Sequence, residues 1–145
     1  MTGVDGAARR LAREAALQML YQWEVGRVGA HEAIVTYWAN RDDVADVPDE
    51  SRRFADALLR GTIERVGEAD ALIAGHAHNW RVERMAVIDR LVLRLAIFEL
   101  LSEPDTPAKV IINEALELAR TFSGEEPVPF INGILDAVRK TLGRE

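Results

Sequence analysis

The chain has 145 residues, 48% of them hydrophobic, and no cysteine, so it suits one domain with an apolar core and excludes disulfides and thiolate metal sites. Its net charge of −6 argues against indiscriminate nucleic-acid binding, which needs a basic field, but leaves room for a local basic patch. No apolar run approaches the roughly 20 residues that cross a bilayer, and no apolar signal core follows the N-terminus, so we expect a cytoplasmic protein without membrane contact.

Apolar residues recur with a helical period along the whole chain, and glycine or proline separates the periodic stretches. No stretch alternates apolar and polar residues as a strand would. We therefore expect residues 1–7 to form a flexible tail and residues 8–145 to form a single domain, an all-α compact bundle of about seven helices. The helices are expected over about residues 8–25, 31–40, 49–66, 68–76, 84–101, 107–122 and 127–142.

The fifth of these helices is apolar almost all round, so other helices must surround it, and we expect it to be the central helix. Two other helix starts carry capping signals. Residues 49–51 offer capping side chains before the third helix, and Gly67 is expected either to kink that helix or to end it. Asp105-Thr106-Pro107 predicts a capping side chain followed by proline at the first helical position of the sixth helix.

The first helix combines an apolar face with an arginine-rich one. At 100° per residue, one set of side chains should pack inward: Ala8, Leu11, Ala12, Ala15, Met19 and Trp23. Arg9 lies beside a second, continuous stripe formed by Arg10, Arg13, Leu17 and Tyr21. Guanidinium groups in such a stripe can hold phosphates or stack on bases, and a tyrosine ring can stack on an unpaired base.

A solvated face, with Glu14 pairing locally, explains the same arginines without any ligand, and Tyr21 could be a half-buried packing residue. The helix dipole does not favour cations in the first turns of a helix, which mildly supports a functional role for the arginines. The stripe alone leaves both interpretations open.

No recognisable catalytic or cofactor-binding pattern is present. The sequence lacks a glycine-rich phosphate loop, a GxSxG elbow, an HExxH motif and a dinucleotide fingerprint. His76 and His78 would point to nearly opposite sides of a helix, so they do not predict a metal site. We expect a protein that is not an enzyme and that uses no metal or cofactor.

Three stretches resemble the NusB family of bacterial transcription antitermination factors. They are the arginine-rich segment 8–21, the central helix with the segment that follows it, 88–115, and Phe-Ile-Asn-Gly-Ile-Leu-Asp at 130–136. Their order and spacing hold from residue 8 to about residue 140, nearly the whole chain.

The resemblance implies a NusB-like all-α fold of two small helical subdomains around the central apolar helix. It implies binding to the boxA element of nascent ribosomal RNA leader transcripts together with NusE, a small-subunit ribosomal protein. That complex would join NusA, NusG and RNA polymerase and make elongation resist termination.

The resemblance also carries RNA-binding roles over to individual residues. In the arginine-rich segment these are Arg9, Arg10, Arg13 and Tyr21, with Gln18 as a weaker candidate. The aromatic residue of the third stretch, Phe130, would stack on a base. The alternative for Phe130 is a buried packing role at the start of the seventh helix.

Two departures from the family pattern predict weak, salt-sensitive binding of RNA by the protein alone. The N-terminal tail contains Asp5 and no basic residue, and Glu125 and Glu126 precede Phe130. Because phosphate contacts carry much of the affinity for RNA, a partner would be needed for useful affinity.

Two other functions stay open at this point. The same kind of helical domain accompanies some ribosomal-RNA cytosine methyltransferases as an RNA-binding accessory, and a helical protein-interaction module without RNA specificity would show similar periodicity. A homodimer that buries the first helix would mask the RNA surface.

Overall fold

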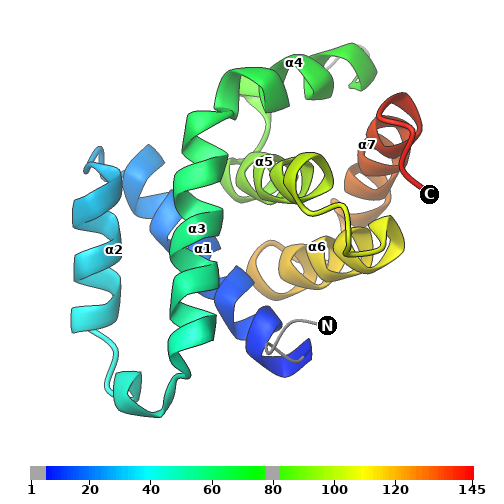
Figure 1. Ribbon diagram of the computed structural model, residues 1–145. Helices are drawn as coiled ribbons and strands as arrows, with labels where there is room; N and C mark the ends of the chain where they lie inside the picture. Colours follow the sequence, from blue (N-terminus) through cyan, green and yellow to red (C-terminus); the bar gives the residue numbers. More distant parts are fainter. Residues whose placement is uncertain (1–5, 78–81) are drawn as a thin grey trace. The chain divides into compact units, whose positions relative to one another are not determined.

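The computed structural model describes residues 6–77 and 82–145, and within these ranges it contains helices and no strand. The all-α expectation is confirmed, and all seven helices are present close to their expected positions (Figure 1). Their bounds are α1 Gly6–Glu24, α2 Ala30–Ala39, α3 Asp49–Glu64, α4 Val66–His76, α5 Val87–Ser102, α6 Ala108–Phe122 and α7 Val128–Thr141.

The chain divides into two compact units, as the resemblance to a two-subdomain family led us to expect. The boundary falls between Ile63 and Glu64, so the first unit holds α1 to α3 and the second holds α4 to α7. Among residues 6–77 and 82–145, every helix is too short or too polar to span a bilayer.

In the first unit α1 packs against α2, and small side chains on α1 are fully buried, namely Ala12, Ala15 and Ala16. Polar contacts join α2 to α3. The indole Nε1 of Trp38 donates a 2.9 Å hydrogen bond to Asp56 Oδ1, and the Arg52 guanidinium lies 5.2 Å from the centre of the Trp38 ring. These contacts hold α2 in place against α3, and α2 forms one wall of a groove described below.

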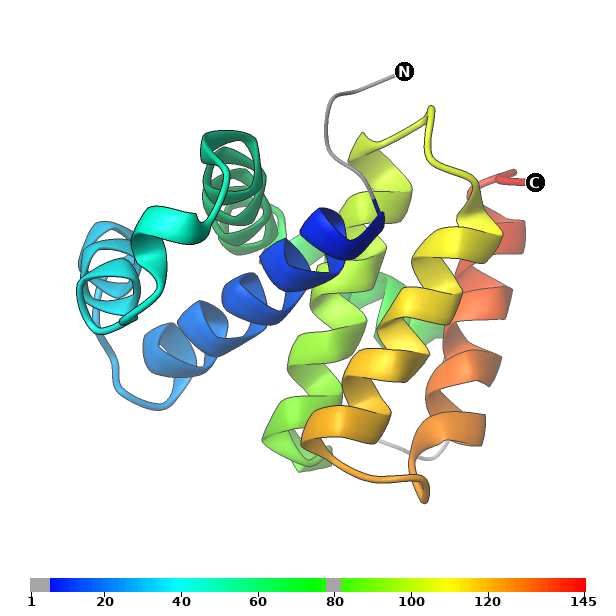
Figure 2. The same cartoon turned by 90° about the horizontal axis from the view of Figure 1, so that it is seen from below.

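In the second unit α5 packs against α4, α6 and α7, which confirms it as the central helix of that unit. Figure 2 shows α5, α6 and α7 lying side by side. All of α5 from Arg90 to Ile97 is buried, including two arginines. One of these, Arg94, donates two hydrogen bonds, of 2.8 and 2.9 Å, to the two carboxylate oxygens of Asp70 on α4.

Several boundaries differ from the expected ones. The helix break falls at Arg65, the N-cap of α4, rather than at Gly67, which lies within α4. Two short 3-10 helices, Val44–Asp46 and Val82–Arg84, were not predicted. Helix α1 begins at Gly6, inside the expected tail of residues 1–7, whose first five residues lie outside the described part of the chain.

The expected cap of α6 is wrong. Pro107 is the N-cap rather than the first helical residue, with an extended ψ of 138°, and no side chain caps the helix. The reason lies in the preceding turn, where the backbone N–H of Thr106 donates to the Glu103 carbonyl and the Thr106 carbonyl accepts a hydrogen bond from Arg144. These bonds hold residues 103–106 in a turn that ends at Pro107.

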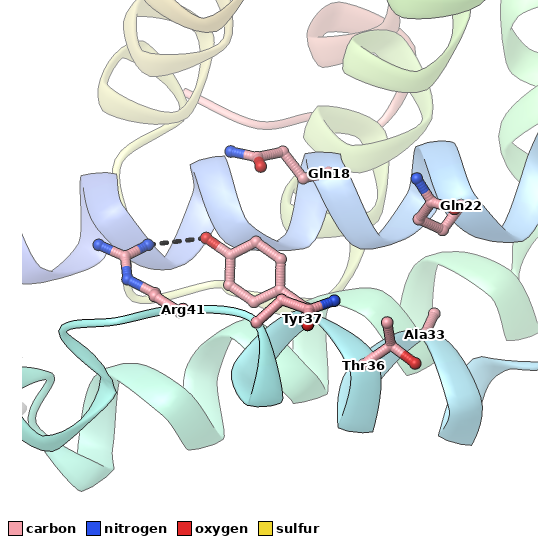
Figure 3. A pocket seen from close by; sticks show the side chains of 7 residues that line it. Gln18, Gln22, Ala33, Thr36, Tyr37 and Arg41 are labelled. Atoms are coloured by element: carbon pink, nitrogen blue, oxygen red, sulfur yellow. Dashed lines mark hydrogen bonds between the residues drawn. The ribbon is translucent and has the colours of Figure 1, made fainter.

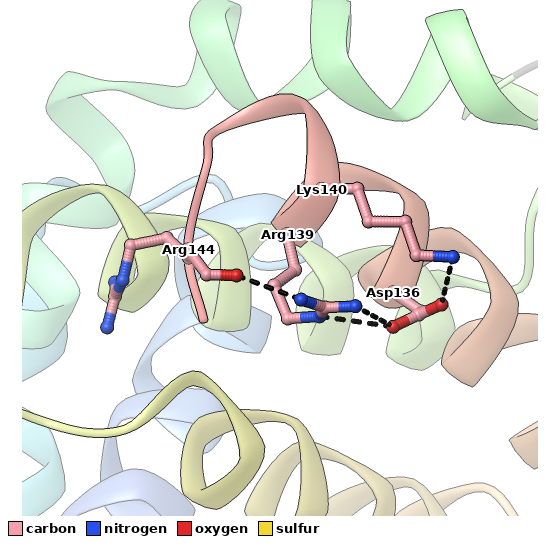
Figure 4. Close-up of polar contacts among 4 residues, drawn as sticks. All are labelled: Asp136, Arg139, Lys140 and Arg144. Carbon is pink, nitrogen blue, oxygen red and sulfur yellow. Dashed lines mark hydrogen bonds and ion pairs between the residues drawn. The ribbon is translucent and has the colours of Figure 1, made fainter.

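The C-terminal residues close over the end of α5. The Arg144 guanidinium donates hydrogen bonds to the backbone carbonyls of Leu100, Glu103 and Thr106. Arg139 Nη1 donates a 2.9 Å hydrogen bond to the Arg144 carbonyl, as Figure 4 shows. Carbonyls in the last turn of a helix lack intrahelical partners, and the Arg144 side chain satisfies one of these, that of Leu100, together with two carbonyls of the segment that follows α5.

Candidate nucleic-acid interface

Helix α1 presents fewer of its predicted binding residues to solvent than the helical wheel suggested. Arg10, Gln18 and Tyr21 are exposed, Tyr21 by 38%, whereas Arg9 is half-buried. Arg13 is only 3% exposed and Leu17 only 1%. The prediction of a continuous solvent-exposed stripe is therefore wrong for Arg13 and Leu17, which are buried, and holds for Arg10 and Tyr21 at its two ends.

The physical reason is that α1 is covered on more than one side. The residues expected to face inward are indeed inaccessible at Ala12, Ala15 and Met19, but Ala16 and Leu20, outside that set, are fully buried as well. A wheel gives the angular positions of side chains but not how many neighbours surround the helix.

Two arginines of α1, Arg9 and Arg13, lie over an aromatic ring of α3. The guanidinium carbon of Arg9 is 4.6 Å from the centre of the Phe54 ring, and that of Arg13 is 5.8 Å away. Both distances allow cation–π attraction, which holds a guanidinium in place without removing its charge. No local pattern in the sequence predicts the role of Phe54, because the contact joins two helices.

A polar groove lies between α1 and α2, along part of their contact within the first unit (Figure 3). We call it the α1–α2 groove; its cavity volume is about 490 Å³, and it is lined by Gln18, Gln22, Ala33, Thr36, Tyr37, Asn40 and Arg41. Only Gln18 was a candidate from the sequence. The remaining polar residues come from the last turn of α1, from α2 and from the loop after it. No local pattern in the sequence predicts that these three segments line one groove.

Arg41 at one end of the groove is held by its neighbours. Its Nε and Nη2 donate hydrogen bonds of 2.5 and 3.1 Å to the Asp43 carboxylate, and its Nη1 donates one of 2.7 Å to the Tyr37 hydroxyl. The hydrogen bond to Asp43 is the main cause that raises the pKa of Arg41, and the same contact lowers the pKa of Asp43. Both groups therefore stay ionised at neutral pH and largely neutralise each other.

Phe130 lies in the first turn of α7, in the second unit, and is half-buried rather than fully enclosed. It lines a cavity of about 540 Å³ together with Met85, Ala86, Asp89, Ser123, Glu126 and Pro127. Two of these neighbours carry carboxylates: Glu126, from the acidic sequence before Phe130, and Asp89, from α5. A ring at the wall of an open cavity can be reached by a stacking base, but the acids there do not attract phosphates.

No cluster of three or more metal-ligating side chains occurs among residues 6–77 and 82–145. His76 contacts the Thr141 hydroxyl at 2.9 Å, a contact between α4 and α7, while His78 lies outside the described residues.

Comparison with known proteins gives consistent sequence matches. A family model described as the NusB family matches residues 10–140. The transcription antitermination protein NusB of Koribacter versatilis is 47% identical over 142 residues, covering 98% of this chain and 95% of that protein. The protein of the same name from Myxococcus xanthus is 45% identical over 137 residues, covering 94% of this chain and 98% of that protein.

Solved structures show the same fold. T. maritima NusB superposes with a TM-score of 0.80 at 35% identity, covering 91% of this chain and 90% of that chain. A structure of the antitermination factors NusB and NusE in complex with dsRNA gives a TM-score of 0.83 at 21% identity, covering 94% of this chain and 99% of that chain. At 21% identity, the similarity to the NusB–NusE complex shows a common fold and no more.

Proposed function

The chain belongs to the NusB family, and on that premise we propose that it is a transcription antitermination factor that binds boxA-type RNA of nascent ribosomal RNA leaders together with NusE. It acts in the cytoplasm, and the complex that it forms with NusE joins NusA, NusG and RNA polymerase to support processive elongation. It binds and positions RNA, and we assign it no catalytic step, metal or cofactor.

The observation that carries this proposal is the exposed side of α1. Arg10, Gln18 and Tyr21 present a guanidinium, a carboxamide and a phenol ring to solvent along one helix. These are the groups that bind phosphates, base edges and base faces in single-stranded RNA. Arg9, oriented by Phe54, adds a second cation near the start of the helix.

We assign Arg13 a different role from the one that the family resemblance implies. With 3% of its surface exposed and its guanidinium over Phe54, it contributes chiefly by holding α1 to α3 and by adding positive potential beneath Arg9. Arg10→Ala is therefore a cleaner probe of RNA binding than Arg13→Ala, which would also remove packing.

The charges predict that RNA binding by the protein alone is weak. The net charge is −6, and Phe130 shares its cavity with Asp89 and Glu126. Each phosphate contact contributes to affinity and to its salt dependence, and few exposed arginines are available on α1. A partner such as NusE that adds RNA contacts would raise the affinity.

Two other functions are weaker candidates. An RNA-binding accessory domain of a ribosomal-RNA cytosine methyltransferase is disfavoured because antitermination proteins match over 95% and 98% of their own length. A helical interaction module without RNA specificity gives no reason for Arg10, Gln18 and Tyr21 to share the exposed side of one helix.

The test is equilibrium binding to a single-stranded boxA-type RNA and to a scrambled RNA of the same composition, with and without NusE. We expect tighter binding to the boxA-type RNA, with the preference strengthened by NusE and the affinity decreasing as salt increases. Equal affinities for the two RNAs, with NusE present as well as absent, would contradict the proposal.

A further inference from the structure

We propose that the α1–α2 groove binds one unstacked nucleobase of the RNA and discriminates between bases by hydrogen bonds to its edge. This inference rests on the proposed RNA-binding function and adds a base-recognition site built largely from α2 and the loop after it. The groove has a cavity volume of about 490 Å³, and Gln18, an exposed residue of α1, is one of its lining residues (Figure 3).

The polar groups of the groove suit a base edge. Gln18, Gln22 and Asn40 each offer a carboxamide with one acceptor oxygen and two N–H donors, and Thr36 adds a hydroxyl. Within residues 6–77 and 82–145 these four side chains make no hydrogen bond to another residue, so their donors and acceptors are available to a ligand. A carboxamide can pair with a base through two parallel hydrogen bonds, which gives discrimination.

The charged groups of the groove argue for a base rather than a phosphate. Arg41 is its one arginine, and the Asp43 carboxylate already binds that guanidinium through two nitrogens. A phosphate would have to compete with Asp43 for Arg41, at a cost in desolvation and repulsion. A neutral base meets no such penalty.

Tyr37 supplies an aromatic wall with a fixed orientation. Its hydroxyl accepts the hydrogen bond from Arg41, and its ring meets the Trp38 ring edge to face, with centroids 4.9 Å apart. Trp38 in turn is bonded to Asp56 on α3. Preorganised aromatic rings lower the entropic cost of binding a base.

The position of the groove on α1 connects it to the proposed phosphate contacts. Gln18 and Gln22 are four residues apart and so lie on one side of the helix. Gln18 follows Arg10 by eight residues, about 12 Å along the helix axis. An RNA strand whose phosphate contacts Arg10 can therefore follow α1 toward the groove and place a splayed base there.

The experiment compares binding of single-stranded RNAs that are identical except at one position, which carries each of the four bases in turn, scanned along the strand. The test variant is Gln22→Met combined with Asn40→Ala, which removes two carboxamides at exposed positions. Asn113→Ala, which removes an exposed carboxamide from α6, is the matched control. Thermal melting of each variant checks that the fold is kept, and Thr36→Val provides an independent change in the groove.

We expect the unmodified protein to discriminate between bases at one position by about tenfold or more. In the Gln22→Met, Asn40→Ala variant this ratio should fall close to one, and in Thr36→Val it should fall partly, while the salt dependence stays the same. Arg10→Ala should weaken binding to all the RNAs and keep the ratio, because a phosphate contact carries no base information.

An unchanged base ratio in both groove variants would overturn the inference while leaving the proposed function intact. Loss of NusE binding with an unchanged base ratio would also overturn it and would make the groove a protein-docking site. Failure of the unmodified protein to bind any of the RNAs, with or without NusE, would remove the proposed function and the inference together.

Discussion

Arg9 on α1 holds its guanidinium carbon 4.6 Å from the centre of the Phe54 ring on α3. This contact orients a cation that RNA can use, so Phe54 acts on binding through Arg9. Phe54→Leu removes the aromatic face but keeps the apolar packing. We expect RNA affinity to fall about two- to fivefold, the range of an exposed cation–π interaction, with the salt dependence unchanged because the arginines are still there.

Fluorescence anisotropy with a labelled boxA-type RNA at several salt concentrations measures this effect. Phe122→Leu, which changes an exposed aromatic residue on α6, is the control and should leave the affinity unchanged. If the Phe54→Leu variant binds RNA as tightly as the unmodified protein, the Phe54 ring does not contribute to RNA binding through Arg9.

The pair between Asp70 and Arg94 is expected to stabilise the second unit. Arg94 has 9% of its side chain exposed, so removing Asp70 leaves a nearly buried guanidinium without its bidentate partner. Because the Asp70 carboxylate is one-third exposed, we expect Asp70→Ala to lower the free energy of unfolding by about 2 kcal/mol, less than for a fully buried pair. Urea denaturation measures the loss.

The control is Glu68→Ala, which breaks an exposed pair with Arg65 and should lower the free energy of unfolding by at most about 0.5 kcal/mol. Similar losses in both variants would contradict a stabilising role of the Asp70–Arg94 pair.

Arg144 is expected to stabilise the end of α5 through its bonds to the carbonyls of Leu100, Glu103 and Thr106. Arg144→Ala should lower the free energy of unfolding by about 1–2 kcal/mol, and Arg144→Lys should recover only part of this, because an ammonium group cannot match the planar guanidinium geometry. Hydrogen exchange should speed up for amides in residues 100–106 more than for amides in α1. Equal protection of residues 100–106 in the unmodified and Arg144→Ala proteins would rule out this role.

The Asp136 carboxylate on α7 provides a pH test. A hydrogen bond from Arg139, and to a smaller extent one from Lys140, lowers the pKa of Asp136 below its ordinary value (Figure 4). Because the folded-state pKa lies below the unfolded one, the contribution of Asp136 to stability is present above the unfolded pKa and is lost as pH falls through the folded one. An NMR titration of the Asp136 carboxyl carbon should show its pKa returning toward the ordinary value in Arg139→Gln, and less so in Lys140→Gln. A pKa of Asp136 that is the same in all three proteins would contradict this cause.

The helices could be predicted from the sequence because each depends on local periodicity and on glycine or proline at its ends. The central position of α5 followed from its lack of a polar face, which only surrounding helices can accommodate. The cap of α6 was mispredicted because its outcome depends on Arg144, a residue remote in sequence from Thr106. Local signals describe what a segment favours by itself, and a tertiary hydrogen bond overrode one of them.

The candidate site was only partly predictable for the same reason. The periodicity of α1 placed Arg10 and Tyr21 on an exposed side, as the structure has them. It could not predict that Arg13 would be buried over Phe54, nor that Asn40 would line one groove with Gln22, because both relations depend on how α2 and α3 pack against α1. Contacts between helices are absent from any single-helix pattern.

RNA binding by α1 is tested most directly by two matched variants, Arg10→Gln and Arg60→Gln. For each, the dissociation constant for boxA-type RNA is measured across a range of salt concentrations. Both arginines are exposed, one on α1 and the other on α3, so each substitution removes one surface charge. We predict that Arg10→Gln weakens binding about tenfold and reduces the slope of log affinity against log salt by about one, while Arg60→Gln changes neither noticeably. Equal effects of the two substitutions, or no effect of Arg10→Gln, would contradict the claim that α1 binds the RNA.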